Sequence, residues 1–144
     1  MLNYKFILKL SLFPLIMLYA CGGVLGHIER YKFENISPSR LQTVVANYLS
    51  IHKEYSSDKF KSVEIVPDTY EYYITIRDGS SVYKMAYIFP KYDPPYDTIA
   101  EITLTTAGPI DKPLKLSGDL GFFEKRKYQK LFKEYFIEKI KREL

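Results

Sequence analysis

The feature that most constrains the fold is a pair of alternating segments separated by one turn. Residues 70–76 and 83–89 each carry an apolar or aromatic side chain at every second position, which is the period of a β-strand with one buried face. Asp78, Gly79 and Ser80 lie between them and form a turn signal. A two-residue turn at Asp78-Gly79 and one at Gly79-Ser80 pair the apolar faces equally well. We therefore predict an antiparallel hairpin with two open registers.

Two further segments indicate strands beside this hairpin. Residues 63–66 are rich in β-branched side chains, and residues 100–105 alternate again before Gly108-Pro109. The intervening residues 90–97 contain three prolines, which fix φ and lack an amide donor, so this segment cannot be a regular strand. Short links between consecutive strands favour an antiparallel meander of about four strands.

Apolar residues at helical spacing occur on both sides of these strands. Ser37 is a helix-capping residue followed by proline at the first helical position, which predicts a helix over residues 38–53. A second helix is predicted from near Asp119 to the C-terminus. Its apolar stripe consists of Tyr128, Leu131, Phe132, Tyr135, Phe136 and Ile140. Ile137 falls outside that stripe, so we expect the helix to be less regular after Phe136.

This order of elements predicts an α+β domain over residues 37–144. We expect an N-terminal helix, an antiparallel meander of about four strands, and a C-terminal amphipathic helix packed on one sheet face. The order resembles cystatin-like and related helix-on-sheet folds. The resemblance is one of element order and implies no function, because no sequence motif accompanies it.

The N-terminal residues follow the layout of a secretory signal. Lys5 and Lys9 precede an apolar run, Leu10 to Ala20, which is too short for a membrane-spanning helix of about 20 residues. The run ends in Leu18-Tyr19-Ala20-Cys21, which resembles the lipobox of bacterial lipoproteins. The resemblance implies removal of residues 1–20 and attachment of lipid to Cys21, the only cysteine. Two alternatives remain open: an ordinary cleaved signal and an uncleaved anchor.

The resemblance also implies where the chain lies. Several acyl chains hold a protein on a membrane much more firmly than one. Gly22 stands where the inner-membrane retention signal of the family places Asp, which favours the outer membrane facing the periplasm. Residues 21–36 are then a lipidated tether, although they are apolar enough that part of them could instead pack as an N-terminal strand.

The positive net charge of +4 does not indicate a nucleic-acid-binding protein. Two of the 21 basic residues, Lys5 and Lys9, leave with the signal, and residues 124–143 hold eight basic and four acidic side chains. The positive charge therefore belongs to the C-terminal segment, and a secreted location argues against nucleic acid as a partner. With Cys21 lipidated no disulfide can form, so the domain must be stable through packing alone.

The sequence predicts no catalytic residue, metal or cofactor. His27 and His52 are the only histidines, and no metal-binding, nucleophile-elbow or phosphate-binding motif occurs. We predict a structural role for His52 near the end of the first helix. Asp68, Asp93 and Asp97 match no calcium loop and are expected to cap backbone groups. Glu71 and Glu101 are expected to be solvated on the outward faces of strands.

Two segments are candidate binding surfaces. The loop residues Tyr92, Pro94, Pro95 and Tyr96 form an aromatic, proline-stiffened surface that would lose little entropy on binding a protein partner. They could instead fold back over the sheet edge. The basic residues Arg126, Lys127, Lys130 and Lys133 of the last helix, together with Lys141, could face anionic lipid or an acidic glycan. An ordinary solvated helix face is the alternative.

We therefore predict a membrane-anchored lipoprotein of the bacterial envelope that acts by binding, as an accessory or assembly factor, and not by catalysis. One alternative is an immunity- or inhibitor-type lipoprotein that binds a partner protein. Another is a carrier of lipid or a small ligand, which requires a cavity between helix and sheet lined by tyrosines. A small hydrolase is the least favoured alternative.

Overall fold

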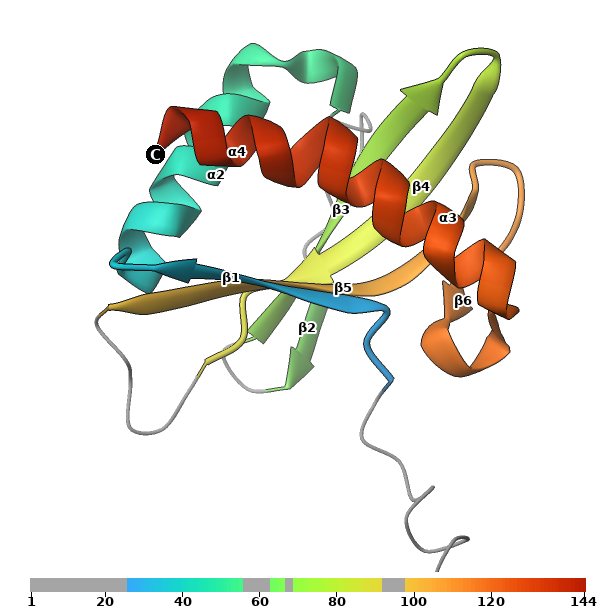
Figure 1. The fold of residues 1–144 in the computed structure, drawn as a ribbon, viewed down its shortest axis with the longest axis horizontal. Helices are drawn as coiled ribbons and strands as arrows, with labels where there is room; N and C mark the ends of the chain where they lie inside the picture. Colours follow the sequence, from blue (N-terminus) through green and yellow to red (C-terminus); the bar gives the residue numbers. More distant parts are fainter. Residues whose placement is uncertain (1–25, 56–62, 67–68, 92–97) are drawn as a thin grey trace, which may run out of the picture.

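The computed structural model describes residues 26–55, 63–66, 69–91 and 98–144. They form an α+β fold in which the helices cover one face of an antiparallel sheet (Figure 1), so the predicted class and the packing of the C-terminal helix are confirmed. The strand order is β1-β5-β4-β3-β2, with β6 also paired to β5. The strands are β1 (Glu29–Glu34), β2 (Val63–Val66), β3 (Thr69–Asp78), β4 (Ser81–Ile88), β5 (Ile99–Pro109) and β6 (Lys115–Leu116). The helices and helical turns are α2 (Pro38–Ile51), η1 (Lys53–Tyr55), η2 (Ser117–Asp119), α3 (Phe122–Phe132), η3 (Lys133–Ile137) and α4 (Glu138–Glu143).

The predicted hairpin is β3 and β4, and the structure decides between its two registers. Asp78 lies opposite Ser81, so the turn is Gly79-Ser80. Gly79 has φ +59°, a left-handed conformation that glycine adopts without steric cost. The pairing places Ile74 opposite Met85, and both side chains are fully buried beneath the helices.

Strand β5 organises the sheet because three strands pair with it. It continues the meander from β4, and its other edge pairs first with β1 and then with the two-residue β6. The alternative that part of residues 21–36 packs as a strand is therefore confirmed for β1. Strand β6 was not expected from the sequence, because two residues are too few to show an alternation of apolar and polar side chains.

Helix α2 begins as predicted and ends at Ile51. The Ser37 hydroxyl accepts a hydrogen bond from the Arg40 amide at 3.2 Å, which satisfies one of the free donors of the first turn. The buried side of α2 consists of Leu41, Val44, Val45, Tyr48 and Leu49. After Ile51, the amide of His52 donates to the Tyr48 carbonyl at 2.9 Å and closes the helix.

The C-terminal helix differs from the prediction at two points. It begins at Phe122, because Asp119 belongs to the short turn η2 and Gly121 occupies the N-cap position. The segment η3 is a π-helical turn, which inserts one extra residue and changes which side chains face inward. Ile137 is consequently buried, although the regular stripe excluded it. The predicted irregularity is present and starts at Lys133, earlier than expected.

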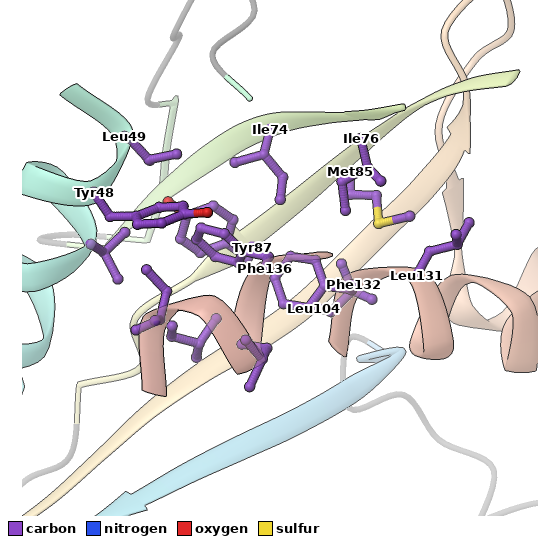
Figure 2. Close-up of a cluster of buried hydrophobic side chains, with 14 of the residues drawn as sticks. Tyr48, Leu49, Ile74, Ile76, Met85, Tyr87, Leu104, Leu131, Phe132 and Phe136 are labelled. Carbon is purple, nitrogen blue, oxygen red and sulfur yellow. The ribbon is translucent and has the colours of Figure 1, made fainter. Parts of the chain in front are cut away.

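The core is aromatic and lies between the hairpin and both helices (Figure 2). The ring of Tyr87 lies 6.0 Å from that of Phe132 and 5.3 Å from that of Phe136. Tyr72 stacks on the other side of Tyr87 at 5.6 Å. Each such aromatic pair contributes about 0.5–1.5 kcal/mol beyond the area it buries, so the packing supplies the stability that no disulfide provides.

Candidate functional site

Several predicted site residues lie outside the described residues. These are Cys21, Tyr92, Asp93, Pro94, Pro95, Tyr96, Asp97 and Asp68. The lipid anchor and the aromatic loop therefore stay predictions. Among the described residues, no cluster of three or more His, Cys, Asp or Glu side chains is placed to hold a metal ion.

The four basic residues predicted as one surface are separated into two pairs by the helix. Lys130 and Lys133 border a groove beside β1. Arg126 and Lys127 contact aromatic rings instead: the Arg126 guanidinium lies 4.8 Å from the ring centre of Phe122, and the Lys127 ammonium lies 4.5 Å from that of Tyr83. The structure thus places the two pairs of basic residues in different surroundings.

The groove lies between the edge strand β1 and the C-terminal helix and encloses about 580 Å³. Its base is fixed by side chains from both elements. The Tyr31 ring packs 5.6 Å from that of Phe132, and its hydroxyl donates to the Gln129 carbonyl at 3.1 Å. The Gln129 amide donates to the Ile28 carbonyl at 3.0 Å. Burial, followed by the nearby Glu29 carboxylate, raises the pKa of Tyr31, so its hydroxyl stays a neutral donor.

Cations outnumber acids along this groove. It is bordered by Lys32, Lys130, Lys133 and Lys141, with Glu29 and Glu134 as the acids. Arg30 also borders it, but its guanidinium turns toward Glu101, and Lys141 lies 3.3 Å from Glu138. Lys130 lies 4.0 Å from Glu134, in an exposed pair of the kind that contributes little stability. In the described part of the chain, no carboxylate lies within ion-pairing distance of Lys133. The groove is therefore positively charged and open to an anionic partner.

The prediction that Glu101 is solvated on the sheet face opposite the helices is wrong. This side chain is only 3% exposed, because β5 is a central strand with neighbours on both sides. Its carboxylate accepts from Thr103 at 2.6 Å and lies 3.7 Å from the Arg30 guanidinium. Arg30 therefore directs its charge to this face rather than into the groove.

Glu71 lies on the same face, on β3. It is half-buried and accepts hydrogen bonds from Tyr73 at 2.6 Å and Thr105 at 2.8 Å. Burial and the hydrogen bond to Glu71 raise the pKa of Tyr73 to about 12. Because β4 separates Glu71 from Glu101 and different hydroxyls hold them, the two carboxylates do not form a facing acid–base pair.

A second hollow of about 360 Å³ lies between α2 and the hairpin. Tyr72, Tyr87 and Phe89 line one side, and Gln42, Thr43, Val45, Ala46 and Leu49 of α2 line the other. The Tyr87 hydroxyl is buried and has no hydrogen-bond partner among the described residues. Burial raises the pKa of this hydroxyl, which keeps it neutral. The hollow has the aromatic lining that the ligand-carrier alternative requires.

The two histidines show no catalytic arrangement in the described residues. His52 follows α2, where its ring packs 4.3 Å from that of Tyr48 and its Nδ1 lies 3.1 Å from an exposed Glu54 oxygen. These contacts fit the structural role predicted for it. His27 is half-buried and precedes β1.

Comparisons with protein-family models, with curated proteins and with solved structures found no match for this chain. Within the ranges that the structure describes, no helix is long and apolar enough to cross a membrane.

Proposed function

We propose that the protein is a lipoprotein of the bacterial envelope, anchored through Cys21, that binds the anionic segment of a partner protein and catalyses no reaction. The observation that carries the binding role is the basic groove, because Lys130 of α3 and Lys133 of η3 lie beside β1 there, which is about 100 positions earlier in the chain. This role includes accessory, assembly and inhibitor-type lipoproteins, which differ in the identity of the partner.

The groove suits an extended acidic segment. Strand β1 is at the edge of the sheet, and an edge strand can pair with an added strand through its backbone. The lysines of the C-terminal helix run alongside it and would neutralise acidic side chains of the added strand. The tyrosine loop, Tyr92 to Tyr96, is proposed as a second contact with the same partner.

The lipid anchor is tested by Cys21→Ser, which removes the thiol that receives the lipid. We expect the variant in the soluble envelope fraction and the wild-type chain in the membrane fraction. Unchanged fractionation would show that Cys21 does not anchor the protein.

The groove is tested by cross-linking the protein in membranes and identifying what it captures. Lys130→Glu/Lys133→Glu should abolish capture of the partner, since it reverses the charge beside β1. Lys53→Glu/Arg77→Glu is the matched control, with the same change of charge at two exposed positions outside the groove. Equal loss in both pairs would indicate general electrostatic attraction and contradict a groove site. Tyr92→Ser/Tyr96→Ser should weaken capture if the loop contributes.

The aromatic hollow favours a second candidate function, the carriage of a lipid or small apolar ligand. Its volume falls within the usual range for ligand sites, about 300–1,000 Å³. Mass spectrometry of an organic extract of the purified protein would then detect a bound ligand. Ala46→Trp, which fills the hollow from α2, should remove that ligand, and extracts without any ligand would contradict this function.

A further inference from the structure

Two exposed aromatic side chains lie side by side where the C-terminal helix begins. Phe123 is 84% exposed and Phe122 is 65% exposed. The two phenylalanine rings pack edge to face at 5.5 Å. Adjacent exposed aromatic residues are unfavourable in water, and such patches on soluble domains usually mark an interaction site. We call Phe122 and Phe123 the aromatic patch.

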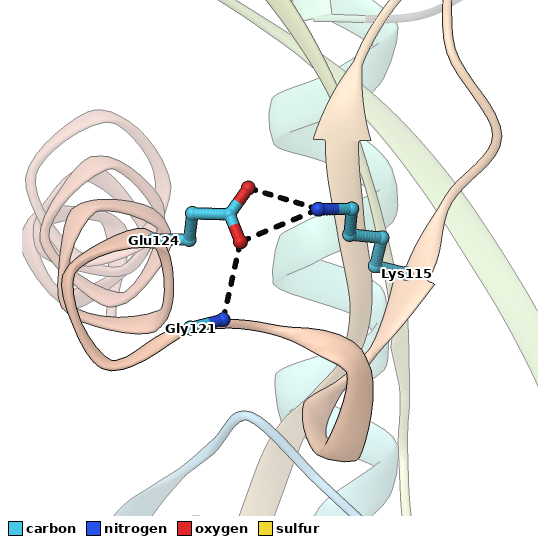
Figure 3. Close-up of polar contacts among 3 residues, drawn as sticks. All are labelled: Lys115, Gly121 and Glu124. Atoms are coloured by element: carbon cyan, nitrogen blue, oxygen red, sulfur yellow. Dashed lines mark hydrogen bonds and ion pairs between the residues drawn. The ribbon is translucent and has the colours of Figure 1, made fainter.

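The patch is held in place by polar contacts behind it (Figure 3). The Lys115 ammonium lies 3.0 and 3.3 Å from the two carboxylate oxygens of Glu124. One of these oxygens also accepts from the Gly121 amide at 3.1 Å. These bonds connect β6 to the first turn of α3, so the backbone that carries the two phenylalanines is fixed and loses little freedom on binding.

The patch lies close to the point at which the described chain begins. A Cβ built on Gly26 would lie 3.2 Å from the Cβ of Ser117, the residue after Leu116. Figure 1 shows the same arrangement, with the start of β1 passing beside β6. Five residue steps join Cys21 to Gly26, and a fully extended chain of that length reaches at most about 18 Å. A lipid on Cys21 would therefore keep Gly26, and the turn η2 that precedes α3, within about 18 Å of the bilayer surface.

We infer that the aromatic patch inserts into the interface of the bilayer that holds Cys21 and fixes the orientation of the domain on the membrane. The inference rests on the proposed lipid anchor. Phenylalanine favours the boundary between headgroups and acyl chains when basic side chains lie beside it. Residues 111–127 hold five basic and three acidic side chains, and the Arg126 guanidinium lies against the Phe122 ring. The surface is therefore complementary to anionic headgroups.

Anchoring makes this weak contact effective. Two side chains would not hold a free protein on a membrane, but a tethered patch meets a bilayer at high effective concentration. Lys130 lies eight residues after Phe122, about two helical turns further along the axis. Docking through the patch therefore leaves the groove beside β1 accessible to a partner.

The chain contains no tryptophan, so one introduced indole reports on its own surroundings. Phe123→Trp retains an aromatic side chain in the patch. Ile51→Trp is the matched control, because Ile51 is 75% exposed at the far end of α2. Both full-length lipidated variants are reconstituted into vesicles of phosphatidylcholine and phosphatidylglycerol, with and without brominated acyl chains.

We expect the F123W emission to shift to shorter wavelength on vesicles and to be quenched by brominated lipid, while the I51W emission stays unchanged. Adding Phe122→Ser to F123W should reduce the quenching. Protein that sediments with vesicles but shows no quenching of F123W, or equal quenching of both variants, would overturn the docking and leave the anchor intact. Wild-type protein that does not sediment, or a Cys21→Ser chain that sediments equally well, would overturn the anchor and the docking with it.

Discussion

The C-terminal helix carries two pairs of phenylalanines with opposite surroundings. Phe132 and Phe136 are fully buried against the hairpin, whereas Phe122 and Phe123 are exposed in the first turn. The sequences around the two pairs are similarly basic. The difference follows from spacing along the helix. Phe132 and Phe136 are four residues apart and share one helix face, whereas Phe122 and Phe123 are adjacent and do not share a face.

This comparison separates side chains that stabilise the domain from those available for contact. A buried phenylalanine contributes through the area it removes from water and through its neighbours. An exposed one contributes little to stability and can be used at a membrane or a partner. Four experiments with substituted chains follow, from the largest expected effect to the smallest.

Phe132→Ala should lower the free energy of unfolding by about 3–5 kcal/mol, since it leaves a cavity between hairpin and helix. Phe123→Ala should change it by less than about 0.5 kcal/mol. Urea denaturation followed by circular dichroism measures both. Similar losses in the two variants would show that the first turn of α3 is part of the core.

Ile137→Ala should lower the free energy of unfolding by about 2–5 kcal/mol, because the π-helical turn directs this side chain into the core. A regular α-helix would leave Ile137 outside the apolar stripe and Lys139 within it. Lys139→Ala is the matched control and should have the smaller effect in the same denaturation experiment. The reverse order would indicate a regular helix in solution.

Tyr87→Phe should stabilise the domain by about 1 kcal/mol, because it removes a buried hydroxyl that has no partner among the described residues. Tyr31→Phe should destabilise it by about 1 kcal/mol, since the Tyr31 hydroxyl donates to Gln129. Thermal unfolding of the two variants gives the sign of each change. A loss of stability in Tyr87→Phe would indicate that this hydroxyl is bonded.

Glu124→Gln should have the smallest effect, and one that depends on pH. The Lys115 ammonium, followed by the Gly121 amide, lowers the pKa of Glu124 from 4.5. The ionised carboxylate therefore stabilises the fold fully above pH 4.5, and this contribution is lost as the pH falls through the lower folded pKa. The melting temperatures of wild type and variant should differ at neutral pH and converge in acid. A difference in melting temperature that stays the same at every pH would mean that the charge of Glu124 does not cause the change in stability.

Much of the fold could be predicted because it depends on local patterns. The alternation in β3 and β4, the Ser37 cap and the stripe through Phe132 each follow from a period or a local hydrogen bond. The start of α3 was predicted at Asp119 and lies at Phe122, because residues 117–119 form a separate turn. The position of Ile137 outside the apolar stripe indicated that the helix is irregular, but it did not show where the irregularity begins.

The candidate site was less predictable because its parts are distant in the chain. The four basic residues were assigned to one surface, but the structure places only Lys130 and Lys133 beside β1. The sequence alone does not show this arrangement, because residues 21–36 were expected to be a tether and a strand in that segment was only an alternative. Glu101 was expected in solvent because its strand alternates, and neighbouring strands on both sides bury it.

The sequence by itself determined the class of fold, the hairpin, the two amphipathic helices and a candidate lipid-attachment residue, because these depend on neighbouring residues. The tertiary structure alone decided the hairpin register, the pairing of β1 and β6 with β5, and the groove between β1 and the last helix. It also brought Gly26, just before β1, against Ser117 in the turn that precedes α3. These features join residues up to about 100 positions apart, and long-range packing, not local preference, selects them.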